Sequence, residues 1–329
     1  MDDKLKNPDH LFQSALKSLP IPDQPSRLYQ PVSYTLNLGG KRLRPRLVML
    51  SCGLCGGQPE KAIPAALAVE MLHNFTLIHD DIMDNAETRR GQPTVHHKWD
   101  EATAILSGDV LFVMAMKQFT RYGKEFPEQH AMTTELTTCF LDAVQEVCDG
   151  QAMDMDFETR DDVVSGEYLQ MIKAKTAALI RCSMQLGGLI AGAGKEAVEV
   201  CGEIGDHAGI AFQIQDDLLD AVGDASTFGK KVGGDIIEGK KTFLSILALE
   251  RADDADRIIL NQTLGDSKAG EDDILKVIRI YHDLGVIDEA AKTINHHYNN
   301  ALEKLDEFEE SEYQGEIKSL LDKLKDRDN

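Results

Sequence analysis

The stretch Leu275–Ile280, LKVIRI, and the stretch Ala301–Leu305, ALEKL, both place apolar residues three and four positions apart. This spacing gathers the apolar side chains on one face of an α-helix. All 10 prolines lie between Pro8 and Pro127, so residues 128–329 contain none. Because a proline inside a helix costs about 3 kcal/mol, a long proline-free segment favours successive long helices. No segment alternates β-branched and polar residues as a strand would, so the sequence predicts an all-α fold.

Composition limits the classes of partner. The 329 residues contain 35 Lys and Arg against 56 Asp and Glu, a net charge of −21. Such a surface repels phosphate backbones, which argues against nucleic acid as a partner. The N-terminus lacks a signal-peptide pattern and no run reaches the ~18 uncharged apolar residues of a spanning helix, so we expect a cytoplasmic protein without a transmembrane segment. No linker divides the chain, which predicts one domain over residues 1–329, with residues 300–329 as a solvated terminal helix.

Two acidic clusters carry the chemical signal. Asp80, Asp81 and Asp84 follow the apolar segment FTLI, and the same DDxxD spacing recurs 136 residues later at Asp216, Asp217 and Asp220. At 100° per residue, the first and last aspartates of each cluster lie about 40° apart on a helix. Carboxylates held this close repel one another unless a cation binds them. Oxygen-only ligands select a hard cation, and Mg²⁺ completes its octahedron with water and substrate phosphates.

The basic residues of this acidic chain fall into a few groups that could bind phosphate. Arginine binds phosphate through two parallel hydrogen bonds, and lysine binds it as a point charge. Taken alone, each group could be a surface patch, but their positions near both aspartate clusters favour a diphosphate site. They are GGKRLRP at Gly39–Pro45, TRRG at Thr88–Gly91, Lys175 with Thr176, Lys230 with Lys231, and Lys240 with Lys241.

Over nearly its whole length the chain resembles the trans-isoprenyl diphosphate synthases, or polyprenyl synthetases. Seven motifs occur in the family's order: GGKRLRP at Gly39, HDDIMDN at His79, RRG at Arg89, GQAMD at Gly150, KTA at Lys175, FQIQDD at Phe212 and GKKT at Gly239. The resemblance implies the isoprenoid synthase fold, a bundle of mostly antiparallel helices around a deep central cavity, with the two aspartate motifs facing each other at its mouth. It also implies a homodimer.

The resemblance assigns roles residue by residue. Mg²⁺, about three ions per active site, would be held by the six aspartates Asp80, Asp81, Asp84, Asp216, Asp217 and Asp220. The allylic diphosphate would be contacted by Arg89, Lys175, Thr176, Gln213, Lys230 and Lys240, of which Arg89 and Lys175 also act in catalysis. The diphosphate of isopentenyl diphosphate would be bound by Lys41, Arg44, His73 and Arg90. His73 lies about 20° from Asp80 on a helical wheel, so both would face one cavity.

The charges then suggest the chemistry. Cations neutralise the departing pyrophosphate, so the allylic carbon–oxygen bond ionises. The double bond of isopentenyl diphosphate attacks the resulting cation, and released pyrophosphate takes the proton. Apolar walls exclude water from the cation.

Product length is expected to depend on the helix before the first aspartate motif. Leu72, Phe75 and Thr76 form one wedge that would flank the growing tail. In the family, small residues at both the Phe75 and Thr76 positions resemble long-chain enzymes, and aromatic residues at both resemble farnesyl diphosphate synthases. Phe75 with Thr76 resembles the geranylgeranyl type, which makes a twenty-carbon product. Farnesyl diphosphate and a twenty-five-carbon product stay open.

Two other classes of protein compete with this interpretation. Class I terpene cyclases share the metal-assisted ionisation, but they replace the second DDxxD and need no second diphosphate site. A noncatalytic synthase subunit commonly loses one aspartate motif, whereas both are intact here.

Overall fold

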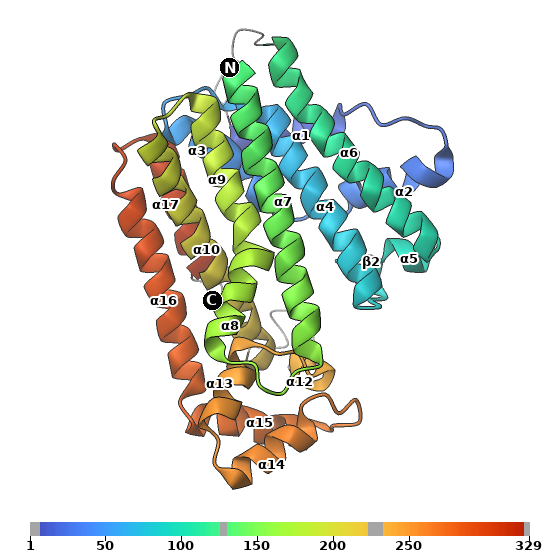
Figure 1. Ribbon diagram of the computed structural model, residues 1–329, viewed down its shortest axis with the longest axis vertical. Helices are drawn as coiled ribbons and strands as arrows, with labels where there is room; N and C mark the ends of the chain where they lie inside the picture. Colours follow the sequence, from blue (N-terminus) through green and yellow to red (C-terminus); the bar gives the residue numbers. More distant parts are fainter. Residues whose placement is uncertain (1–6, 126–129, 223–232, 326–329) are drawn as a thin grey trace. The chain divides into compact units, whose positions relative to one another are not determined.

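The computed structural model describes residues 7–125, 130–222 and 233–325, and these form an almost entirely helical protein (Figure 1). The predicted all-α class is confirmed. The one sheet among the described residues is a hairpin of two-residue strands, β1 (Thr88–Arg89) and β2 (Gln92–Pro93). The chain forms two compact units, residues 1–144 with 182–201 and residues 145–181 with 202–329. The single functional domain expected for residues 1–329 stays a prediction.

Unit 1 contains the N-terminal helices. Its elements are α1 (Pro8–Lys17), α2 (Ser26–Asn37), α3 (Leu43–Leu54), the short turn η2 (Pro59–Ala62), α4 (Ile63–Met83), α5 (Val95–Lys98) and α6 (Glu101–Glu125). Unit 2 contains α8 (Ser165–Ile172), the π-helical turn η3 (Lys173–Ala177), α12 (Gly234–Glu238), α13 (Phe243–Arg251), α14 (Asp254–Thr263), α15 (Glu271–Asp283), α16 (Val286–Leu305) and α17 (Glu312–Lys325). Three long helices contribute to both units: α7 (His130–Glu158), α9 (Ala178–Ala191) and α10 (Lys195–Val222).

The core helix of unit 1 is α4. Pro64 lies in its first turn, where a missing N–H costs nothing. Every residue from Pro64 to Leu72 is buried and all but Glu70 are apolar, as expected for a core helix. Helix α6 runs beside it, and α3 covers another face (Figure 1). This packing fixes the end of α4, where the first aspartate motif lies.

Helix α6 also has an apolar composition. Among the described residues it is the one helix, over Glu101–Lys124, that is long and apolar enough to cross a membrane. Half of its most apolar window is buried inside the protein, as in a core helix of this kind. The cytoplasmic location expected from the sequence stays a prediction.

The C-terminal segment differs from the expected solvated helix. Residues 300–325 contain the end of α16 and a separate helix, α17, which buries Ile317, Leu321 and Leu324. Gln215 of α10 ties both helices down: its side chain donates to the carbonyl of Lys325 (3.0 Å) and accepts from the Tyr298 hydroxyl (3.0 Å). The expectation was wrong because charges on one face of a helix say nothing about the apolar stripe on the other. The C-terminus therefore supports the helix that carries the second aspartate motif.

Candidate active site

The first aspartate motif lies at the C-terminal end of α4. Asp80 and Asp81 are in the last turn, and Asp84 is the C-cap residue. Asp81 is only 4% exposed, whereas Asp84 is exposed and Asp80 is half-buried. The motif therefore presents two carboxylates toward solvent and one toward the protein.

Asp81 is held by the hairpin that follows α4. The Arg89 Nε donates to Asp81 Oδ1 at 2.6 Å. Burial raises the pKa of Asp81, and the Arg89 guanidinium opposes this shift. The sequence predicted both residues for the site, and the structure brings them together.

The residues expected to bind a second diphosphate also meet in unit 1. Arg44, in the first turn of α3, lies with its Nη1 3.4 Å from His73 Nε2. Arg90 donates to the carbonyl of Gly39, and its guanidinium lies against Gly40 in the GGKR loop, which also carries Lys41. Burial, and then the positive charges headed by Arg44 and Arg90, hold the pKa of His73 well below its usual range. The residues predicted to bind the second diphosphate thus combine positively charged arginines with the neutral imidazole of His73.

An ion pair that the sequence did not predict fixes this loop. Arg42 adopts a left-handed backbone conformation (φ 49°) and pairs with Glu70, both side chains being almost fully buried. Arg42 also donates to the carbonyl of Leu36 at 2.6 Å, and Glu70 accepts from Asn74 at 2.8 Å. Breaking a buried pair of this kind costs roughly 3–5 kcal/mol, since one charge is left unpaired. The pair holds the start of α3 and hence the position of Arg44.

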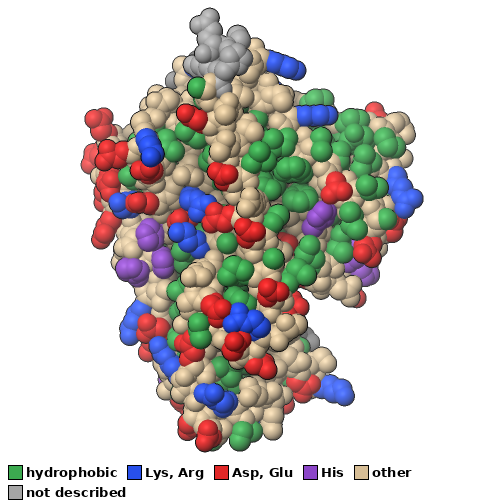
Figure 2. All heavy atoms as spheres, viewed as in Figure 1, with side chains coloured by type: hydrophobic (Ala, Val, Ile, Leu, Met, Phe, Trp, Pro, Cys, Tyr) green, Lys and Arg blue, Asp and Glu red, His purple; other side chains and the backbone are tan. Residues whose placement is uncertain are grey.

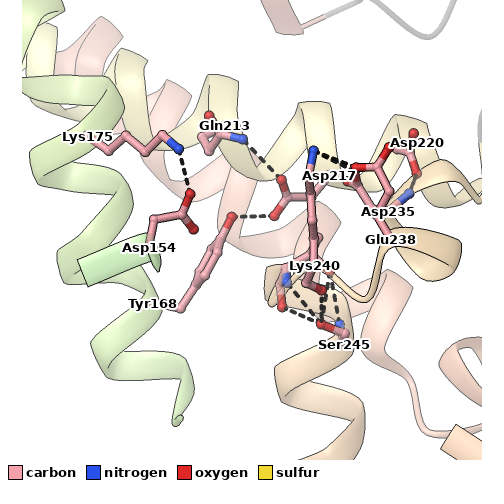
Figure 3. Close-up of polar contacts among 11 residues, drawn as sticks. Asp154, Tyr168, Lys175, Gln213, Asp217, Asp220, Asp235, Glu238, Lys240 and Ser245 are labelled. Carbon is pink, nitrogen blue, oxygen red and sulfur yellow. Dashed lines mark hydrogen bonds and ion pairs between the residues drawn. The ribbon is translucent and has the colours of Figure 1, made fainter. Parts of the chain in front are cut away.

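The second aspartate motif lies on α10 in unit 2, and Figure 3 shows its surroundings. Asp217 is 6% exposed and accepts from three donors: the Tyr168 hydroxyl, the Gln213 side chain (3.1 Å) and the backbone N–H of Phe243 (3.1 Å). Burial raises the pKa of Asp217 to about 7, against the lowering effect of these hydrogen bonds. Asp217 therefore joins α10 to α8 and to the start of α13.

Asp220 holds the short helix α12. Its Oδ2 accepts from the backbone N–H of Asp235 at 2.8 Å. The Lys240 ammonium pairs with Glu238 (2.9 Å) and lies 3.8 Å from Asp235 (Figure 3). Lys240 is thus brought beside the second motif, as predicted, whereas Lys230 lies outside the described residues.

The π-helical turn η3 presents the KTA motif. Lys175 Nζ donates to Asp154 at 2.5 Å, and the Thr176 hydroxyl donates to Gln213 Oε1 at 2.9 Å. Because Gln213 also donates to Asp217, Thr176 and the second aspartate motif belong to one hydrogen-bonded chain. The facing of the two aspartate motifs, which belong to different units, stays a prediction.

The donor set fits a hard divalent cation that is completed by other ligands. Asp80, Asp84, Asp216 and Asp220 are carboxylates that are not fully buried. Within residues 7–125, 130–222 and 233–325, no three His, Cys, Asp or Glu side chains are close enough to hold a metal ion. Mg²⁺ binds in such surroundings through one or two carboxylates, several waters and substrate phosphates.

The three residues expected to set product length differ in their surroundings. The ring of Phe75 lies against His79 (centroids 4.6 Å apart) and Phe112 of α6 (6.0 Å). Leu72 is 1% exposed, and the Thr76 hydroxyl donates to the carbonyl of His73 at 2.9 Å. Phe75 is half-buried and contacts α6 through Phe112, whereas Leu72 belongs to the core.

Sequence reasoning missed Tyr168 and the role of Asp154. Tyr168 reaches Asp217 from 49 positions away, and no local pattern marks it. Asp154 ends the GQAMD motif, which the sequence singled out without assigning it a role.

Comparison with known proteins gives one consistent result. The family model described as polyprenyl synthetase matches residues 25–281. The chain is 39% identical to the short chain isoprenyl diphosphate synthase of Methanothermobacter thermautotrophicus, over 93% of this chain and 92% of the relative. It is 34% identical to the geranylfarnesyl diphosphate synthase of Natronomonas pharaonis, over 96% and 94% of the two chains. The structure resembles that of geranylgeranyl pyrophosphate synthetase from Pyrococcus horikoshii, with TM-score 0.91, 35% identity and coverage of 98% and 97%.

Proposed function

Because the chain belongs to the polyprenyl synthetase family, we propose that it is a short-chain trans-prenyltransferase that condenses isopentenyl diphosphate with allylic diphosphates. The observation that carries this proposal is the presence of two separate cationic groups, each beside an aspartate motif. Arg44, His73 and Arg90 gather in unit 1, and Lys175 and Lys240 in unit 2. A class I cyclase, which binds one diphosphate, needs only one such group.

We propose that Mg²⁺ is held by both aspartate motifs, where it supplies neutralising charge for the departing pyrophosphate. Asp80, Asp84, Asp216 and Asp220 have side chains open enough to serve as ligands. Asp81 and Asp217 belong to the same motifs but are buried, and they accept hydrogen bonds from Arg89 and from Tyr168 and Phe243. A carboxylate has about four lone-pair positions, so Asp217, which accepts three hydrogen bonds, keeps about one for a cation.

The allylic diphosphate is proposed to bind to one set of side chains: Arg89, Lys175, Thr176, Gln213, Lys230 and Lys240. Lys175 and Lys240 offer ammonium groups to its oxygens, and Thr176 offers a hydroxyl. When the allylic carbon–oxygen bond breaks, its electron pair leaves with the diphosphate. These donors stabilise the negative charge that develops on the leaving oxygen.

Isopentenyl diphosphate is proposed to bind to Lys41, Arg44, His73 and Arg90. The neutral imidazole of His73 adds a hydrogen-bond donor without adding charge beside Arg44. The double bond of the bound substrate attacks the allylic cation, and a new carbon–carbon bond forms. Released pyrophosphate takes the proton that leaves, and the product is an allylic diphosphate five carbons longer.

We propose geranylgeranyl diphosphate as the main product, because Phe75 is the one large side chain of the Phe75–Thr76 pair. Farnesyl diphosphate and geranylfarnesyl diphosphate are the alternatives. Relatives of similar identity are named for different products, geranylgeranyl diphosphate in one and geranylfarnesyl diphosphate in another, so sequence similarity alone does not fix the length.

The test is direct. Purified protein is incubated with labelled isopentenyl diphosphate, Mg²⁺ and each allylic primer, and the dephosphorylated products are sized. We expect a dominant twenty-carbon alcohol and no turnover when the metal is chelated. A fifteen-carbon or twenty-five-carbon product would keep the reaction and change the proposed length. No condensation with any primer would favour a noncatalytic subunit.

We also propose a homodimer formed through α6. This helix exposes Ile105, Leu106 and Val113. The part of α7 that belongs to the same unit exposes Leu141. Figure 2 shows hydrophobic side chains gathered in this region of the surface. Exposed apolar patches of this kind mark protein–protein contacts more often than isolated apolar residues do.

The dimer is tested by mass in solution. Light scattering after size exclusion should give twice the chain mass for the wild type and the single chain mass for the double variant Leu106→Asp, Val113→Asp. The control is Leu275→Asp, which changes an equally exposed leucine (56%) on α15. A wild-type monomer, or a double variant that keeps the wild-type mass, would contradict the proposal.

A further inference from the structure

The GQAMD motif at Gly150–Asp154 packs against the π-helical turn that carries Lys175. A Cβ atom at Gly150 would overlap the backbone N of Lys175 and would lie 2.7 Å from its Cα. Real Cβ atoms essentially never approach another heavy atom closer than 3.0 Å. The backbones of α7 and η3 therefore touch at this point, and only glycine permits the contact.

A second glycine, on helix α10, also allows a close backbone contact with η3. A Cβ atom at Gly209 of α10 would lie 2.5 Å from Ala177 Cα. The turn η3 is thus enclosed between two helices whose backbones approach it closely. A longer side chain at Gly150 or Gly209 would push the turn away from that helix.

Each of these helices also carries a polar partner for η3 one turn beyond its glycine. Asp154 lies four residues after Gly150 and accepts from Lys175 Nζ. Gln213 lies four residues after Gly209 and accepts from the Thr176 hydroxyl. Residues four apart share one helix face, so each helix approaches the turn with a glycine and then a hydrogen-bond acceptor.

We propose that Gly150, Asp154 and Gly209 are positioning residues for the allylic diphosphate. They hold the π-helical turn so that Lys175 and Thr176 present their donors in a fixed geometry. Lys175 has three N–H donors, and the one taken by Asp154 leaves two for diphosphate oxygens. Figure 3 shows the Lys175 and Asp154 side chains pointing toward each other. The inference rests on the proposed function of Lys175 and Thr176.

The alternative is that the glycines serve only helix packing. Gly205 provides a matched control, because a Cβ there would also lie 2.5 Å from a backbone Cα, that of Arg181. Arg181 lies beyond η3 on α9, and its guanidinium pairs with Glu146 and Asp206. Gly166, with open space around it, controls for glycine replacement itself.

The first experiment measures KM for the allylic primer and for isopentenyl diphosphate separately. Gly150→Ala and Gly209→Ala should raise the primer KM by about tenfold, the effect of misplacing a charge-assisted hydrogen bond. The isopentenyl diphosphate KM should stay within about threefold of wild type. Gly205→Ala should lower the melting temperature and leave both KM values unchanged. Gly166→Ala should leave both KM values unchanged without lowering the melting temperature.

Asp154→Asn is a second variant that introduces no steric clash, and it tests the inference even if a glycine variant fails to fold. It keeps the shape of the side chain, removes its charge and should raise the primer KM in the same way. Calorimetric titration with inorganic pyrophosphate and Mg²⁺ should show the same loss of affinity. An unchanged primer KM in Asp154→Asn, or an equal rise in Gly205→Ala, would overturn the inference. If the wild type binds pyrophosphate without condensing any primer, the proposed function fails while the titration still tests the positioning.

Discussion

Replacing Asp80 by asparagine is expected to lower kcat by about 10³-fold, and replacing Asp216 by asparagine should do the same. Each change removes a carboxylate charge from the first, half-buried position of its motif while keeping the side-chain shape. Fewer charges then hold the cation that neutralises the leaving pyrophosphate. Half-maximal activity should require a higher Mg²⁺ concentration in both variants. Steady-state rates measured across a Mg²⁺ titration check both expectations.

The matched control is Asp283→Asn, because Asp283 ends α15 and its side chain is 67% exposed. It removes one acidic charge from the same chain, so a loss of activity caused by net charge alone would appear there as well. We expect its kcat to stay within about twofold of wild type. If Asp80→Asn or Asp216→Asn retained wild-type kcat and Mg²⁺ dependence, that motif would not hold the catalytic cation.

Replacing Phe75 by alanine is expected to shift the product from twenty carbons to longer chains. The Phe75 ring lies against Phe112 of α6, so its removal opens space beside α4 below the first aspartate motif. The growing tail can then extend by further five-carbon units before it meets a side chain. The measurement is the length distribution of dephosphorylated products from farnesyl diphosphate and labelled isopentenyl diphosphate.

Phe112→Ala should lengthen the product in the same direction, because it removes the other ring of the contact. Leu275→Ala, which shortens an exposed leucine (56%) on α15, is the control and should leave product length unchanged. If the Phe75→Ala product distribution matched that of the wild type, Phe75 would be a packing residue only. The loss of ring packing should also lower the melting temperature in both phenylalanine variants.

Local patterns predicted the parts of the site that lie within single segments. The helical spacing predicted the all-α class. The repeated DDxxD predicted the acidic C-terminal end of α4 and the acidic face of α10. The GGKR loop, His73 and Arg90 were predicted to meet and do so in unit 1. These features depend on residue type and short spacing, both of which are readable in one sequence.

The remaining parts depend on contacts between distant segments. Nothing local distinguishes Arg42 from Arg44, yet Arg42 turns inward to Glu70 and Arg44 toward His73. The one feature of the sequence that could have indicated a buried basic partner was Glu70, a lone acid inside a long apolar run. The Tyr168 and Phe243 donors reach Asp217 from 49 and 26 positions away. A single sequence contains no measure of such distances.

The turn η3 adds one residue to the helical segment around it. A π-helical turn bonds each residue to the fifth one along and so contains one residue more than an α-helical turn. An α-helix turns about 100° per residue and the wider π turn turns less, so five residues of η3 cover nearly the rotation of four α-helical residues. Deleting one residue there would restore an α-helix and leave α9 facing nearly the same way, with Arg181 still beside Glu146 and Asp206. The extra residue therefore changes how Lys175 and Thr176 are presented without changing the packing of the helix beyond them.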